Sequence, residues 1–195
     1  SECPPTFRAD PEQVQGIIAG GFPALCQAVE GAEDNAEAGA EAVRFRGVGK
    51  RDVFLGIAAS GRTPFVWGGI WAAKKQGAKT ALLCFNPTIT IPRENKPDVV
   101  INPKIGPELL TGSTRLKSGT ATKLILNIIT TLAMVRIGKV VGNLMVDLDP
   151  SNTKLRDRAV RIVRQLTDAT EPQAHSTLEK TNWVVKDAIA RLSKR

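Results

Sequence analysis

The stretch Val53-Phe54-Leu55-Gly56-Ile57-Ala58-Ala59-Ser60-Gly61-Arg62-Thr63-Pro64 decides the fold class of this 195-residue chain. Its first seven residues form an apolar run without polar alternation, which is typical of a buried strand in a parallel sheet. Pro64 suits the first turn of a helix, where its missing N–H group leaves no hydrogen bond unmade. Small and hydroxyl residues between strand and helix allow backbone N–H groups to converge on an anion. The stretch therefore predicts a phosphate-binding turn, and an ordinary connecting turn is the alternative.

The same alternation of strands and helices continues through the first two-thirds of the chain, which predicts a parallel sheet with helices on both faces. Strands are expected at residues 13–19, 53–59, 80–85 and 99–102, and helices at residues 24–29, 34–43 and 63–76. Residues 121–137 are apolar nearly all round, so we expect a long buried helix there. Further helices are expected at residues 152–166, 172–180 and 183–192. We thus expect an α/β domain over residues 1–150 and a helical region over residues 151–195.

Composition and charge indicate which cellular compartment and which kinds of binding partner to expect. We expect no membrane segment, because no apolar stretch is both long and uncharged, and no leader, because no basic-then-apolar segment opens the chain. The three cysteines are odd in number and lack metal-ligand spacing, which favours a reducing cytoplasm over a disulfide framework. The net charge of +8 is scattered along the chain and aromatic residues make up 5%, so nucleic-acid binding is not favoured.

The candidate catalytic groups are carboxylates. His175 is the only histidine and is expected on a helix surface, which argues against a metal site and against Ser–His–Asp or Cys–His nucleophiles. Glu33 lies in an acidic segment at the start of an expected helix, and Glu2 precedes a rigid pair of prolines. Acidic residues in the first turn of a helix are usually caps or dipole partners. The residues alone therefore leave the role of both glutamates open.

A second segment, residues 111–120 (TGSTRLKSGT), is rich in glycine, hydroxyl and basic side chains. It precedes the long apolar helix, so its hydroxyl groups and the cations of Arg115 and Lys117 are suited to bind a sugar or a phosphate. An ordinary solvated loop is the alternative. Two such loops in one α/β domain are more specific than one, because ligands of open parallel sheets bind beyond the carboxyl ends of the strands.

Five segments become recognisable together: SECPPTF at residues 1–7, VEGAED at 29–34, GIAASGRTP at 56–64, TGSTRLK at 111–117 and GNLMVD at 142–147. In this order they closely resemble the N-acetylmuramic acid 6-phosphate etherases, a family with the sugar-isomerase (SIS) fold, over almost the whole chain. The resemblance implies a three-layer αβα sandwich and a cytoplasmic lyase that needs no cofactor or metal. Such enzymes cleave the D-lactyl ether by elimination across C2–C3 of the open-chain sugar, and water addition gives N-acetylglucosamine 6-phosphate and D-lactate.

The resemblance also implies roles for single residues. Glu2 matches the proton-donor glutamate of the family's SECPPT motif, and Glu33 matches its second active-site glutamate. Four residues match the substrate-binding phosphate loop of sugar-isomerase domains, namely Ser60, Gly61, Arg62 and Thr63. Four more match a second substrate-binding motif, namely Ser113, Thr114, Arg115 and Lys117. Family members are typically homodimers, so we expect a homodimer that binds a sugar phosphate and neither nucleic acid nor membrane.

Several departures from the family remain. Its members carry a first βα unit with a Gly-Thr-Ser-Gly-Arg loop before the SECPPT motif and more helices at the other end, so we expect an incomplete, weakly active form. Residues 85–93 are unusual for the family, although Asn86-Pro87 is kept. A sugar-phosphate-sensing regulator of the glucokinase regulatory protein type is the alternative function, and an aldose–ketose isomerase is a third. Trp67 and Trp71 share one helix face, which is more typical of a core or partner contact than of a ligand platform.

Overall fold

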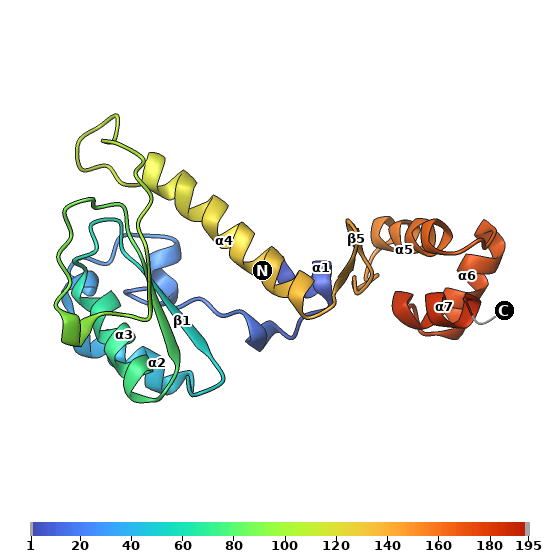
Figure 1. The fold of residues 1–195 in the computed structure, drawn as a ribbon, viewed down its shortest axis with the longest axis horizontal. Coiled ribbons are helices and arrows are strands. Elements are labelled where there is room, and N and C mark those ends of the chain that lie inside the picture. Colours follow the sequence, from blue (N-terminus) through green and yellow to red (C-terminus); the bar gives the residue numbers. More distant parts are fainter. Residues whose placement is uncertain (1, 194–195) are drawn as a thin grey trace. The chain divides into compact units, whose positions relative to one another are not determined.

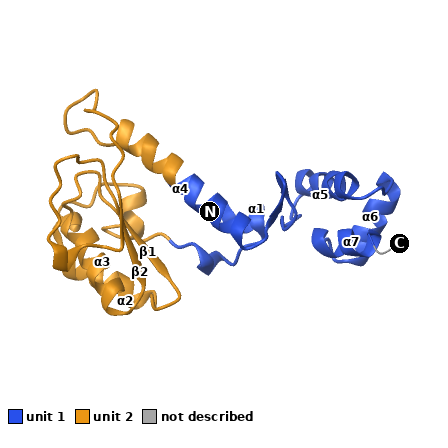
Figure 2. Ribbon diagram, viewed as in Figure 1, with its two compact units in different colours: residues 1–15, 126–195 blue, residues 16–125 orange. Residues whose placement is uncertain are grey.

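The computed structural model describes residues 2–193 and divides the chain into two compact units (Figures 1 and 2). Unit 1 comprises residues 1–15 and 126–195, and unit 2 comprises residues 16–125. Helix α4 (Lys117–Arg136) contributes to both units, because their boundary falls within it. The domain division expected at residue 150 stays a prediction.

Unit 2 contains the expected parallel sheet. Its strands are β1 (Val53–Ile57), β2 (Lys79–Leu83) and β3 (Val99–Ile101), in the order β1-β2-β3. Both neighbouring pairs are parallel, with Val53 opposite Lys79 and Ala81 opposite Val99. The central strand β2 is buried from Thr80 onward. These strands confirm the α/β class and three of the four strand expectations.

Two helices of unit 2 pack closely because each has a glycine where it contacts the other helix. They are α2 (Ala36–Phe45) and α3 (Pro64–Lys75), and α3 lies against β1 and β2. A Cβ atom at Gly39 would clash with the backbone oxygen of Phe65, and one at Gly68 would clash with that of Ala36. On the side of α3 that faces the sheet, the buried side chain of Ile70 packs in one cluster with Leu82 of β2. Single 3-10 turns complete the unit: η2 (Phe22–Leu25), η3 (Ala32–Asp34) and η4 (Arg93–Asn95).

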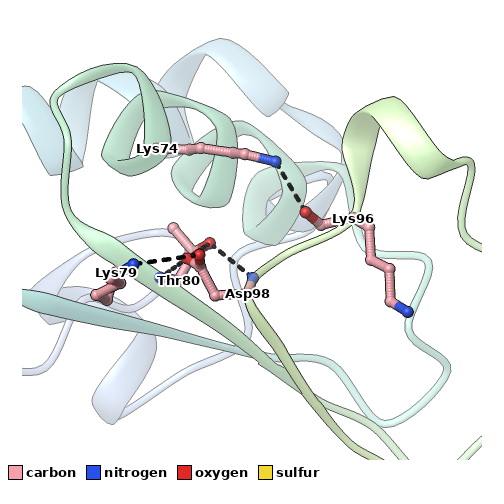
Figure 3. Close-up of polar contacts among 5 residues, drawn as sticks. All are labelled: Lys74, Lys79, Thr80, Lys96 and Asp98. Atoms are coloured by element: carbon pink, nitrogen blue, oxygen red, sulfur yellow. Dashed lines mark hydrogen bonds and ion pairs between the residues drawn. The ribbon is translucent and has the colours of Figure 1, made fainter.

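A polar network fixes where β3 joins β2 (Figure 3). Thr80 is fully buried, and its backbone N–H and its hydroxyl donate to Oδ2 of Asp98 at 2.8 and 2.9 Å. These hydrogen bonds, with Lys79 Nζ at 3.7 Å from Oδ1, hold the pKa of Asp98 below its ordinary value. Lys74 Nζ donates to the backbone oxygen of Lys96 at 2.8 Å, which ties α3 to the segment that leads into β3.

Unit 1 is mainly helical. Its elements are α1 (Cys3–Phe7), the 3-10 turn η1 (Pro11–Gln13), β4 (Val140–Val141), β5 (Leu144–Met145), α5 (Thr153–Leu166), α6 (Glu171–Lys180) and α7 (Val185–Leu192). The last three helices share a core that includes the buried Val163, Leu178 and Val185. Asn152 caps α5, because its side-chain oxygen accepts from the N–H of Leu155 at 2.9 Å. Near α1, Phe7 packs with Met134 of α4.

The strand expected at residues 13–19 and the helix expected at residues 24–29 are wrong. Beyond η1, residues 14–19 carry no regular element, and η2 is only one turn. An extended segment becomes a strand when a neighbour supplies hydrogen bonds, and within residues 2–193 no strand pairs with this segment. Gly20 and Gly21 follow with φ values of 82° and 68°, which end the extended path.

The expectation that the apolar helix is buried is also wrong. In α4, Ser118 and Met134 are buried, whereas Ile128 and Leu132 are each 57% exposed. Apolar composition shows that a surface avoids water, but it does not say which partner covers that surface. By length and composition alone, α4 is also the one helix among the described residues that could cross a membrane, contrary to the sequence expectation.

The buried hydroxyl of Thr80 yields a test of the network in Figure 3. We expect Thr80→Val to lower the free energy of unfolding by about 1–2 kcal/mol, because Asp98 loses a buried hydrogen-bond donor. Urea unfolding followed by circular dichroism measures the change. Thr90→Val, at an exposed threonine of the same unit, is the matched control and should change stability by less than about 0.5 kcal/mol. Equal effects of the two substitutions would contradict the role given to Thr80.

Candidate functional site

The predicted turn between β1 and α3 is present, at residues Ser60 to Thr63. Ser60 and Arg62 are exposed at this turn, whereas Gly61 is buried. Gly61 has φ 71°, and a Cβ atom there would clash with the side chain of Ile89. Only glycine satisfies both the backbone conformation and the close approach. The loop that follows β2 therefore lies directly against the turn.

The hydrogen bonds of the turn show which groups remain for a ligand. The N–H of Gly61 donates to Ala58 O at 2.8 Å, and the N–H of Arg62 donates to Ser60 Oγ at 3.2 Å. Thr63 is the N-cap residue of α3, but its side chain makes no capping hydrogen bond. The first-turn N–H groups of α3 and the hydroxyl groups of Ser60 and Thr63 are thus the donors suited to an anion.

Two asparagines join the loops at the carboxyl ends of the three strands. Asn86 Nδ2 donates to Ser60 O at 3.1 Å, and Asn86 Oδ1 accepts from the N–H and hydroxyl of Thr88. Asn102 Nδ2 donates to Asn86 O at 2.7 Å. Neither asparagine was assigned a role at the site from the sequence alone. The available signal was an amide side chain soon after each of two successive expected strands.

A cavity of about 390 Å³ adjoins the turn. It is lined by Gly61, Arg62, Trp67, Trp71, residues 88–92 and Asn95. Trp67 Nε1 donates to Gly61 O at 2.8 Å, so this indole is attached to the turn. The cavity and the predicted phosphate turn therefore share two residues.

Glu33 lies in η3, which packs against α3 in unit 2. The side chain is exposed, and among residues 2–193 its carboxylate has no hydrogen-bond or ion-pair partner. Helix α2 is capped by Asn35, whose Oδ1 accepts from the N–H of Ala38 at 2.9 Å. Helix capping is therefore not the role of Glu33.

Glu2 is the N-cap residue of α1 in unit 1, and its exposed side chain makes no capping hydrogen bond. Within this unit α1 is held by the N–H of Asp149, which donates to Pro5 O at 3.1 Å. Arg8 follows α1 and lies 3.9 Å from Asp149. Glu2 thus belongs to unit 1 and Glu33 to unit 2, and the position of each glutamate is described only within its unit.

The second predicted binding segment already has a partner inside the protein. Glu108 accepts hydrogen bonds from the N–H groups of Lys117 and Ser118 at 2.8 and 2.9 Å and from the hydroxyl of Ser118 at 2.7 Å. Lys117 Nζ donates to the backbone oxygen of Pro107 at 2.8 Å. A carboxylate thus occupies the N-terminus of α4, while the exposed Thr114 and Arg115 remain on the surface.

His175 is exposed on α6, as expected, and meets the Trp183 ring edge to face at 5.3 Å between centroids. In the part of the chain that the structure describes, no three His, Cys, Asp or Glu side chains gather as a metal-binding group.

Capping by Glu108 predicts a pH-dependent stability. Hydrogen bonds from Ser118 and Lys117 hold the pKa of Glu108 below its ordinary value. The stabilisation is therefore complete above the ordinary pKa and is lost as the pH falls through the lowered value. We expect the difference in unfolding free energy between wild type and Glu108→Gln to be largest near pH 7 and to shrink below about pH 4.

Urea unfolding of both proteins between pH 3 and pH 8 measures this difference. Glu94→Gln, at an exposed glutamate of η4, is the control, and it should show no pH-dependent difference. A difference for Glu108→Gln that is constant with pH would contradict the capping role.

Comparisons with known proteins identify similar domains in two parts of the chain. Residues 3–74 match the glucokinase regulatory protein N-terminal SIS domain, and residues 142–194 match the C-terminal lid domain of glucokinase regulatory protein. The N-acetylmuramic acid 6-phosphate etherases of Mesorhizobium japonicum and Gloeobacter violaceus are 54% and 53% identical over 97% of this chain. The chain spans 61% of the length of each of these relatives. With this identity across nearly all of its residues, the chain is similar to the N-acetylmuramic acid 6-phosphate etherases over the part of their length that it spans.

Proposed function

We propose that the protein is a carbon–oxygen lyase that cleaves the D-lactyl ether of N-acetylmuramic acid 6-phosphate. Its products are N-acetylglucosamine 6-phosphate and D-lactate, as the recycling of cell-wall amino sugars requires. The observation that carries this proposal is identity at about half of all positions with etherases over 97% of the chain. We place the SIS domain within residues 1–150 and assign residues 151–195 to the helical region.

The reaction needs one group that removes a proton and another that supplies one, and carboxyl groups can do both. A base takes the C2 proton, which the neighbouring C1 aldehyde acidifies. The electron pair of that C–H bond forms the C2–C3 double bond as the C3–O bond breaks, and an acid protonates the departing lactate oxygen. Water then adds at C3 and a proton returns to C2.

We assign the two proton-transfer roles to Glu2 and Glu33. Glu2 is the proton donor of the pair, and Glu33 is the second active-site carboxylate. Support comes from the exposure of both side chains and from Glu33 making no capping or ion-pair contact among residues 2–193. These proton transfers use only carboxyl groups, so the proposed reaction calls for no cofactor or metal.

We assign the substrate phosphate to the turn of Ser60, Gly61, Arg62 and Thr63. The uncapped N-terminus of α3 supports this choice, since a helix N-terminus attracts an anion through its N–H groups and its dipole. We assign sugar contacts to the second segment, with Ser113, Thr114 and Arg115 as the groups in reach of solvent and Lys117 next to the capped N-terminus of α4.

Release of D-lactate tests the proposed reaction. We expect Glu2→Gln and Glu33→Gln each to lower kcat by about 10²- to 10⁴-fold, because an amide cannot transfer the proton. A lactate-dehydrogenase-coupled assay with N-acetylmuramic acid 6-phosphate measures the rates. Glu94→Gln is the matched control and should leave kcat unchanged. Wild-type turnover by either active-site variant would remove that glutamate from the mechanism.

A sugar-phosphate-sensing regulator is the second candidate function. The observation in its favour is that both family matches are to domains of glucokinase regulatory protein. A regulator of this type binds a hexose phosphate without turnover. Thermal stabilisation by the sugar phosphate in the absence of D-lactate release would favour it over the lyase.

We infer that a second copy of the chain, in the cytoplasm, covers the exposed apolar side of α4. Leu132 follows Ile128 by four residues and Ile129 by three, Val135 follows Leu132 by three, and each of these side chains is 40–57% exposed. A helix face of this kind needs a partner to exclude water. A bilayer would be the other apolar environment available to a helix of this length.

Solution mass tests the homodimer. We expect light scattering to give twice the chain mass of 20.9 kDa, and Leu132→Lys to give the single-chain mass, because a charge in the apolar contact is costly. Asn127→Lys, at an exposed polar residue of the same helix, should leave the dimer intact. A wild-type protein that is monomeric, or that floats with lipid vesicles, would contradict the proposed dimer.

A further inference from the structure

The cavity beside the phosphate turn has a tryptophan wall that the proposed reaction does not use. Trp67 is held in place, because its indole N–H donates to the backbone oxygen of Gly61 and its side chain packs against the buried cluster of Ile70, Leu82 and Cys84. Trp71 follows one helical turn later, with its ring centroid 6.0 Å from that of Trp67, and is 45% exposed. Of the core or partner contact expected for the pair, Trp67 makes a core contact; both indoles line the cavity, and Trp71 is 45% exposed.

The other walls of the cavity supply polar groups and one cation. Thr90 and Asn95 contribute a hydroxyl and an amide, and Ile89 contributes an apolar side chain. The guanidinium of Arg62 has no hydrogen-bond or ion-pair partner within the described residues. An aromatic face, neutral hydrogen-bonding groups and an unpaired guanidinium are the combination that matches a carbohydrate with an anionic substituent.

We propose that this cavity is a carbohydrate subsite, in which the ring of an N-acetylamino-sugar phosphate lies against the indole of Trp71. The choice of sugar rests on the proposed function. The volume of about 390 Å³ lies within the range of small-molecule sites and suits a single hexose-sized ligand. The sugar ring of a ligand whose phosphate is bound at the turn would extend directly into the cavity, because Gly61 and Arg62 belong to the turn and also line the cavity.

In this arrangement Trp71 positions the sugar and takes no part in proton transfer. The apolar C–H face of the ring packs on the indole, while its hydroxyl and acetamido groups face Thr90 and Asn95. Residues 88–92 lie within the segment 85–93 that we expect to depart from the family pattern, and they thereby form one wall of the subsite. Trp71 and this wall would set the preference for a sugar ring over a bare phosphate.

Calorimetric titration with N-acetylglucosamine 6-phosphate tests the subsite. We expect Trp71→Ala to raise Kd about 10-fold and Trp71→Phe to raise it less than about 3-fold, since stacking survives on a smaller ring. Phe45→Ala, at an aromatic residue that is 89% exposed outside the cavity, should leave Kd unchanged. Inorganic phosphate should bind all four proteins equally, and tryptophan fluorescence should respond to the sugar phosphate but not to phosphate.

The outcomes separate the subsite from the lyase. Trp71→Ala weakening both ligands equally would show that the side chain only supports the turn, and it would overturn the proposal. An unchanged Kd in Trp71→Ala, or no binding of the sugar phosphate by wild type, would also overturn it. Sugar binding that depends on Trp71, without D-lactate release, would support the subsite while contradicting the proposed reaction.

Discussion

The parallel pairing of β1 with β2 is the constraint on which the candidate site depends. The ladder runs past the strand ends, because Ala58 N–H donates to Leu83 O and Phe85 N–H donates to Ala59 O. The turn after β1 and the loop after β2 therefore begin at the same level of the sheet. Antiparallel pairing would place these two segments at opposite ends. The hydrogen bond between Asn86 and Ser60 and the contact of Ile89 with Gly61 both follow from this shared edge.

Close helix packing adds the second condition for the site. Gly39 and Gly68 let α2 and α3 approach to backbone contact, which fixes α3 over the sheet. Because the phosphate turn is continuous with the first residue of α3, a rigid α3 also fixes the direction of its free N–H groups. The same helix carries Trp67 and Trp71, so the turn of residues 60–63 and the aromatic wall of the cavity are parts of one continuous segment. In the complex that we propose, this continuity would hold the substrate phosphate and the sugar ring at a constant separation.

Elements whose signals come from neighbouring residues could be predicted from the sequence, whereas features that depend on a distant partner could not. Strands β1 and β2, helix α3 and the turn were predictable because apolar runs, Pro64 and small residues act within a few positions of one another. Residues 13–19 (QVQGIIA) are apolar only from Gly16 onward, and a strand also needs a neighbour, which the pattern does not reveal. The exposure of α4 was hidden for the same reason. Asn35, two residues beyond Glu33, was the readable sign that the glutamate is free of capping.

The two hydroxyl-rich loops look alike in sequence, and the structure separates them by a single carboxylate. Both precede a helix whose first N–H groups attract an anion. At α4 the protein supplies that anion itself, because Glu108 accepts from Lys117 and Ser118, and the hydrogen bonds lower its pKa. At α3 the cap residue Thr63 makes no such bond. An external phosphate at α4 would have to displace a bonded carboxylate, whereas at α3 no carboxylate of the described residues caps the helix, and this difference in free energy supports the phosphate site that we propose at α3.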